Sequence, residues 1–126
     1  MNANLILQQV AGSLPDDITT LQTDSAAEGY RFIERLIDEW NEGKVQFDKP
    51  DEALLIARFS DKIAGIGGIT EDPFNKSALR MRRFYVRPNF RYRGIAKELA
   101  RKLIADGLNT GRLIYVNAGT DVAPKF

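Results

Sequence analysis

The segment from residue 79 to residue 108 constrains the fold most, because its hydrophobic pattern changes from that of a strand to that of a helix. Residues 79–87 form a strand-like apolar stretch. Pro88 follows and cannot donate a hydrogen bond to a sheet, so the strand is expected to end there. Apolar residues then recur at the spacing of one helical face: Ile95, Leu99, Leu103 and Ile104. A strand that leads directly into a helix predicts an α/β sheet.

The rest of the sequence supplies the other elements of a mixed sheet. Further strands are predicted at residues 4–10, 53–59, 62–70 and 113–117, and the two-residue turn Ser60-Asp61 predicts a hairpin. A short helix or turn follows Pro15. A second helix is predicted over residues 25–42, because Ser25 and Glu28 have the spacing of a capping box. The expected order is β-α-α-β-β-β-α-β, in one domain that spans residues 1–126.

Composition excludes several classes of chemistry. The 126 residues contain neither cysteine nor histidine. Disulfides, Cys/His zinc sites and nucleophilic catalysis that depends on histidine or cysteine are therefore impossible. Acid–base chemistry must use Asp, Glu, Lys, Tyr or a bound water. No apolar run approaches the roughly 20 residues of a membrane span, and the first residues lack the basic segment of a signal peptide, so we expect a cytoplasmic protein without a membrane partner.

Charge is distributed unevenly along the chain. Residues 1–75 hold 14 acidic and 6 basic side chains, whereas residues 76–102 hold 10 basic ones against Glu98 alone. This surplus is consistent either with a solvated basic face or with an anionic ligand.

The turn between the strand and the helix favours the anionic ligand. The first amides of a helix have no partner within it, and the helix dipole places partial positive charge there. Gly94 leaves room for an anion beside the backbone, and Arg91 and Arg93 add positive charge. The glycines of residues 65–68, "GIGG", lack the spacing of a dinucleotide-binding loop, so they are interpreted as small residues of a strand.

The stretch "FYVRPNFRYRGIAKELARKL" resembles the acetyl-CoA-binding segment of the GCN5-related N-acetyltransferase (GNAT) superfamily. The family pattern Arg/Gln-x-x-Gly-x-Gly/Ala corresponds here to Arg91-Tyr-Arg-Gly94-Ile-Ala96. The resemblance implies that acetyl-CoA is the cofactor. It also implies which residues bind it: the backbone of Phe84, Tyr85 and Val86, the turn residues Arg91, Tyr92, Arg93, Gly94, Ile95 and Ala96, and the side chain of Asn117.

The C-terminal region departs from the family. Aligning Ala123 and Phe126 with the family's Asn-x-x-Ala-x-x-Phe-Tyr pattern puts Thr120 at the asparagine position. The tyrosine that often protonates the CoA thiolate would come one residue after Phe126. The family's last helix and strands are also missing, so we expect a C-terminally shortened domain. Its fifth strand would expose an edge, which favours a homodimer or aggregation.

The resemblance implies direct acetyl transfer from acetyl-CoA to a primary amine, which is a small molecule or a peptide. A strand amide such as the Val86 N–H would stabilise the oxyanion. Glu71 is the candidate base, acting directly or through water, with a solvated loop acid as the alternative reading. The side chains of Tyr85 and Tyr115 are expected to pack in the core rather than to supply a phenol.

Two other functions stay open at this point. The first is a non-catalytic module that binds acetyl-CoA. The second is a nucleic-acid-binding domain, because arginines alternate with aromatic residues as on a stacking platform. The residues involved are Arg82, Arg83, Arg87, Arg91 and Arg93, with Phe84, Tyr85, Phe90 and Tyr92.

Overall fold

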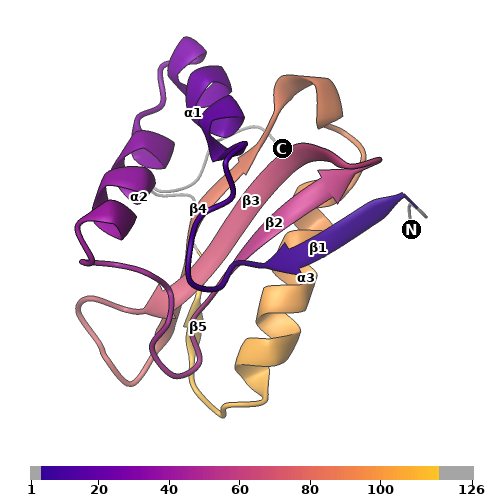
Figure 1. The fold of residues 1–126 in the computed structure, drawn as a ribbon. Coiled ribbons are helices and arrows are strands. Elements are labelled where there is room, and N and C mark those ends of the chain that lie inside the picture. The colour runs from indigo at the N-terminus through magenta and orange to yellow at the C-terminus, as the bar shows by residue number, and fades with distance from the viewer. Residues whose placement is uncertain (1–3, 117–126) are drawn as a thin grey trace.

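The computed structural model describes residues 4–116, which form a five-stranded sheet with helices on both faces (Figure 1). The strands are β1 (Leu5–Gln9), β2 (Ala53–Phe59), β3 (Lys62–Glu71), β4 (Leu79–Val86) and β5 (Ile114–Tyr115). The helices are α1 (Ile18–Ala27), α2 (Phe32–Asn41) and α3 (Ile95–Leu108), and a short 3₁₀ turn, η1, covers Pro88–Phe90. The predicted order of strands and helices is confirmed.

The strands lie side by side in chain order. Neighbours from β1 to β4 are antiparallel, and β4 pairs with β5 in parallel, with α3 as the connection between them. The predicted hairpin between β2 and β3 is confirmed, since both Ser60 and Asp61 have positive φ values, 50° and 70°. That conformation matches the turn type that two-residue hairpins favour.

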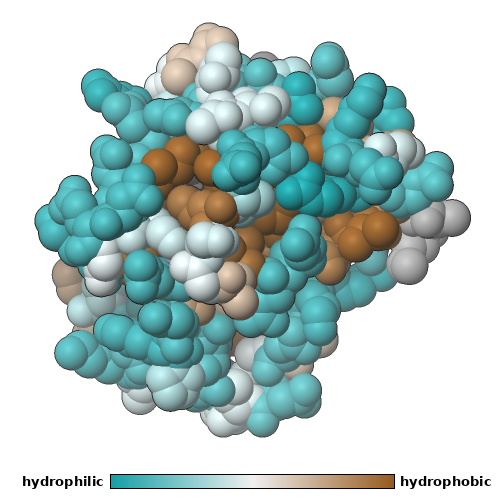
Figure 2. Space-filling model, viewed as in Figure 1, coloured by the Kyte–Doolittle hydropathy of each residue, from teal (hydrophilic) through white to brown (hydrophobic). Residues whose placement is uncertain are grey.

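Two hydrophobic clusters hold the layers together. α1 and α2 pack on one face of the sheet, and α3 packs on the other (Figure 1). On the face seen in Figure 2, hydrophobic surface in the middle is bordered by hydrophilic side chains. The largest fully buried side chains come from both clusters: Leu21, Phe32, Ile33, Leu36, Leu54, Ile56, Ile66, Leu79, Tyr85, Ile95, Leu99 and Leu103.

The predicted helix over residues 25–42 is wrong in its boundaries. α1 ends at Ala27, and α2 begins only at Phe32. Ser25 lies in the last turn of α1, where its hydroxyl donates to the Gln22 carbonyl, and so it is not an N-cap. Gly29 has a φ of 87°, a left-handed conformation that breaks the helix. The side chain of Glu28 instead reaches residues that lie far along the chain.

Two expectations about the last strand are also corrected. β5 has only two residues within the described part of the chain, and Asn117 and the C-terminal segment lie outside the described residues. Tyr115 is 37% exposed rather than in the core, and its ring lies under the Arg80 guanidinium.

Among residues 4–116, no helix has the length and apolar character that crossing a membrane requires.

A bulge interrupts β4 in its second half. Tyr85 pairs with Ile66 and Arg82 pairs with Gly68, so two residues, Arg83 and Phe84, lie opposite the single residue Gly67. Arg83 has a φ of 63°, as a bulge residue commonly requires. The extra residue keeps Phe84 on the α3 face of the sheet and turns the Tyr85 side chain toward α1 and α2.

Candidate functional site

The turn between β4 and α3 has the backbone of an anion site. The first bond of α3 runs from the Glu98 N–H to the Gly94 carbonyl, so the amides of residues 95–97 precede the helical ladder. Gly94 has a φ of 79°, and a Cβ atom added there would meet no atom within 4 Å. Tyr92 also has a positive φ, 64°. The turn therefore presents backbone N–H groups beside open space.

The edge of β4 leads directly into this turn. The Arg87 N–H bonds to the Ala64 carbonyl of β3 at 2.9 Å. Since N–H groups alternate sides along a strand, the N–H groups of Phe84 and Val86 point away from β3, toward the β5 side. The backbone of Tyr85 pairs with Ile66 on β3. Within residues 4–116, the ladder between β4 and β5 covers only Leu79–Arg80 with Ile114–Tyr115. The far half of β4 thus presents an edge along which an extended ligand could pair.

The Arg91 side chain does not point into the turn. Its guanidinium makes two bonds to the Glu28 carboxylate, at 2.8 and 2.5 Å, and its Nε donates to the Val86 carbonyl at 2.9 Å. The hydrogen bonds that Arg91 donates to Glu28 raise the pKa of Arg91. Burial, followed by the Glu28 carboxylate, raises the pKa of the Tyr85 phenol, whose O–H also donates to Glu28. That phenol is therefore a poor proton donor.

Arg93 keeps its charge near the turn. Its side chain is exposed, and its guanidinium lies 5.3 Å from the centre of the Phe59 ring and 5.9 Å from that of Phe90. Such stacking orients an arginine without neutralising it. Arg93 is thus the arginine of the turn that is placed to meet an anion.

Acidic side chains of α1, its C-cap and α2 pair with several arginines of β4 and of the turn that follows it. Arg83 pairs with Glu39 at 2.9 Å, Arg87 with Asp24 at 2.7 Å and Arg91 with Glu28. Phe84 and Tyr85 are buried. These ion pairs and buried rings do not make a basic groove with stacking rings, so the geometry disfavours the nucleic-acid alternative.

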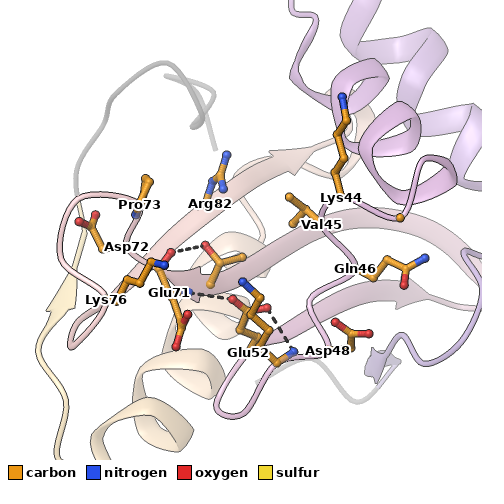
Figure 3. A pocket seen from close by; sticks show the side chains of 13 residues that line it. Lys44, Val45, Gln46, Asp48, Glu52, Glu71, Asp72, Pro73, Lys76 and Arg82 are labelled. Carbon is orange, nitrogen blue, oxygen red and sulfur yellow. Dashed lines mark hydrogen bonds between the residues drawn. The ribbon is translucent and has the colours of Figure 1, made fainter.

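Glu71 lines a pocket between the loop after α2 and the loop between β3 and β4 (Figure 3). The pocket has a volume of about 280 Å³. Lys44 and Arg82 lie on one side of it, and Asp48 and Glu52 on the other. Its lining residues are Gly43, Lys44, Val45, Gln46, Asp48, Lys49, Glu52, Thr70, Glu71, Asp72, Pro73, Lys76 and Arg82.

Hydrogen bonds hold the carboxylates of this pocket in place. Glu52 accepts the N–H groups of Lys49 and Glu71, and the Glu71 carboxylate lies 3.4 Å from Arg112. Asp72 accepts two backbone N–H groups of the following loop and the Nε of Arg80. Burial opposes ionisation of Asp72, but these bonds together hold the pKa of its carboxyl below the usual value.

The sheet register separates Glu71 from the turn. Glu71 pairs with Leu79 at the start of β4, whereas Val86, at the other end, pairs with Gly65. Even Gly67, opposite the bulge, is four residues from Glu71, or about 13 Å at the rise of a strand. The structure therefore brings the turn and the β4 edge together but does not bring Glu71 into contact with them.

The sequence profile of the Acetyltransferase (GNAT) family matches residues 16–123, most of the chain. The chain belongs to the GNAT family. Acetyl transfer is accordingly its reaction class, and the resemblance seen in residues 84–103 is confirmed. No curated protein matches the sequence.

Solved structures show the same fold. A candidate acetyltransferase from Exiguobacterium sp. 255-15 superposes with a TM-score of 0.80 at 21% identity, over 91% of this chain and 76% of that one. A GNAT family acetyltransferase from Elizabethkingia anophelis, with acetyl-CoA bound, gives 0.60 at 16% identity over 94% and 70%. An aminoglycoside acetyltransferase from an uncultured soil metagenomic sample, in complex with sisomicin, gives 0.58 at 16% identity over 91% and 78%.

Three carboxylates around this GNAT site were not predicted from the sequence: Asp24, Glu28 and Glu39. Each pairs with an arginine of β4 or the following turn, between 44 and 63 residues away along the chain. The uneven charge distribution was the available signal, since an acidic segment and a basic segment in one small domain can neutralise each other.

Proposed function

We propose that the protein is an N-acetyltransferase that transfers the acetyl group of acetyl-CoA directly to a primary amine. The observation that carries the proposal is that the edge of β4 left free among the described residues runs directly into the turn at the start of α3. The outward N–H groups of β4 lead into a helix N-terminus with an open left-handed glycine, Gly94.

The described residues fit acetyl-CoA. An extended pantetheine arm suits the edge at Phe84 and Val86, where an added strand would pair. A pyrophosphate suits the amides of residues 91–96 and the charge of Arg93. When bound, acetyl-CoA supplies an acetyl thioester. The neighbour from Elizabethkingia anophelis, which holds acetyl-CoA, supports this assignment at the level of the fold.

The chain's own groups would then act by position and by charge. The Val86 N–H stabilises negative charge that develops on a carbonyl oxygen beside the strand. The attacking amine must first lose a proton. Glu71 is too far along the sheet to contact an amine that lies beside Val86, so it would remove that proton only through intervening water. The pocket that Glu71 lines is the proposed acceptor site. Aminoglycosides are among the first amines to test as acceptors, because one structural neighbour is an aminoglycoside acetyltransferase.

Thermal shift with acetyl-CoA tests the donor assignment. We expect acetyl-CoA and CoA to raise the melting temperature, because a ligand that binds only the native state stabilises it. At a concentration of 100 times Kd the gain is about 2.7 kcal/mol. Single-stranded oligonucleotides serve as the control and should give no shift. A shift with RNA and none with CoA would instead favour the nucleic-acid alternative. Acetyl transfer across a panel of amines then separates an enzyme from a non-catalytic module.

Replacing Glu71 with Ala tests the proposed base. We expect turnover to fall by about 10²-fold, the contribution that a general base typically makes. Added formate should restore part of it, because a small carboxylate can replace the missing one in the pocket. Undiminished turnover, or a loss that formate does not reverse, would show that Glu71 serves only to hold Arg112.

A further inference from the structure

The carboxylate of Glu28 joins the first helix to the proposed donor site. It accepts Arg91 Nη1 at 2.8 Å, Arg91 Nη2 at 2.5 Å and the Tyr85 hydroxyl at 2.5 Å. The Arg91 side chain is only 7% exposed, and Tyr85 is fully buried. Charge-assisted, two-pronged pairs of this kind are among the stronger contacts in proteins and fix the geometry of both partners.

The position of Glu28 in its own helix gives no local reason for a carboxylate. Glu28 is the C-cap of α1, where the helix dipole is negative and an acidic side chain is unfavourable. Arg91 offsets that cost from a segment 63 residues away. The pair therefore links the end of α1 to the turn before α3, and its role is not limited to the stability of α1.

Arg91 passes this link to the backbone of the site. Its Nε donates to the Val86 carbonyl at 2.9 Å, while its own amide lies at the end of η1, bonded to Pro88. The Arg91 guanidinium thus connects the end of β4, at Val86, to the turn before α3. The same peptide segment presents the outward Val86 N–H and the amides of residues 91–96.

We propose that Glu28 is a positioning residue: through Arg91 it sets the orientation of Val86 and of the turn that receives the CoA pyrophosphate. This inference rests on the proposed function. In this proposal Arg91 holds Val86 and the turn in place. The positive charge that meets the phosphate comes from Arg93 and the helix amides.

Glu28→Gln, measured by calorimetry with CoA, tests the proposal. The amide keeps the shape of the side chain but loses the charge that holds Arg91, so we expect Kd for CoA to rise about tenfold, since small misplacements of a site are costly. Asp24→Asn is the matched control. It breaks another ion pair of α1, Asp24–Arg87 at 2.7 Å, without touching Val86 or Arg91. Both variants should lower the melting temperature, but only Glu28→Gln should change Kd.

Tyr85→Phe keeps the test decisive if Glu28→Gln folds poorly, and a double variant adds a second check. Tyr85→Phe removes one bond to the same carboxylate and should raise Kd less than Glu28→Gln. Glu28→Gln combined with Arg91→Gln should bind CoA no worse than Arg91→Gln alone, because residues that act through each other are not additive. Equal Kd values for the wild type and Glu28→Gln would overturn the positioning role. Tighter binding by Glu28→Gln would also overturn it and would make Arg91 a phosphate ligand that Glu28 holds back. A wild type that binds no CoA would instead overturn the proposed function itself.

Discussion

Replacing Gly94 with Val is expected to weaken CoA binding by about a hundredfold, the scale of loss when a bound group is displaced by about an ångström. The space beside Gly94 is open, with no atom within 4 Å of a Cβ position, and it is the space that a phosphate must enter to reach the turn amides. The φ of 79° adds strain of about 1–3 kcal/mol for a residue other than glycine. Calorimetry with CoA measures the first effect, and thermal unfolding measures the second.

Gly12→Val separates these two effects. Gly12 has a φ of 80° and equally open surroundings, but it lies between β1 and α1. It should show a similar strain cost and unchanged affinity for CoA. Lys102→Ala, further along α3, controls for diffuse positive charge and should weaken binding far less. Comparable losses of affinity in all three variants would contradict a specific anion site at Gly94.

Replacing Gly68 with Val should lower the free energy of unfolding by about 3 kcal/mol, a large loss for a domain that is stable by about 5–15 kcal/mol. A Cβ atom at Gly68 would lie 2.6 Å from the buried ring of Phe47 and 3.1 Å from Leu54. On the opposite face of β3, a Cβ at Gly67 would lie 2.9 Å from the Phe84 ring. The "GIGG" stretch is thus required by packing on both faces of the sheet. Urea denaturation measures the loss.

Gly107→Ala is the contrasting variant. Its Cβ would also come close to a side chain, at 2.7 Å, but to the terminal methyl of Ile114, which can rotate away. Alanine also favours the helix over glycine by about 1 kcal/mol. The variant should be nearly neutral or slightly stabilising. A loss as large as that of Gly68→Val would mean that the α3–β5 contact is as tightly packed as the one around Phe47.

Local patterns in the sequence predicted most elements well. β2 has the predicted bounds, α3 contains the predicted apolar face, and the Ser60-Asp61 hairpin is confirmed, because alternation, helical spacing and turn chemistry act over a few neighbouring residues. The anion turn was visible for the same reason: a strand, a glycine and a helix N-terminus are consecutive in the chain.

The failed prediction of one helix over residues 25–42 shows where local patterns stop. The Ser25–Glu28 spacing matches a capping box, but the Glu28 carboxylate has a stronger partner in Arg91. A capping bond contributes about 1 kcal/mol, and a charge-assisted, partly buried pair contributes more. The partner is unknown until the sheet brings residues 28 and 91 together.

Local patterns in the sequence were enough to predict the order of strands and helices, the family and the position of the turn that we assign to the CoA pyrophosphate. Three features depend on the folded arrangement: the bulge at Arg83 and Phe84, the pairing of acidic residues of α1 and α2 with arginines of β4 and the following turn, and the separation of Glu71 from Val86. The difference comes from the range of the interactions involved. Backbone preferences depend on adjacent residues, whereas register and ion pairing depend on segments that meet only after the chain has closed loops of some 20 to 60 residues.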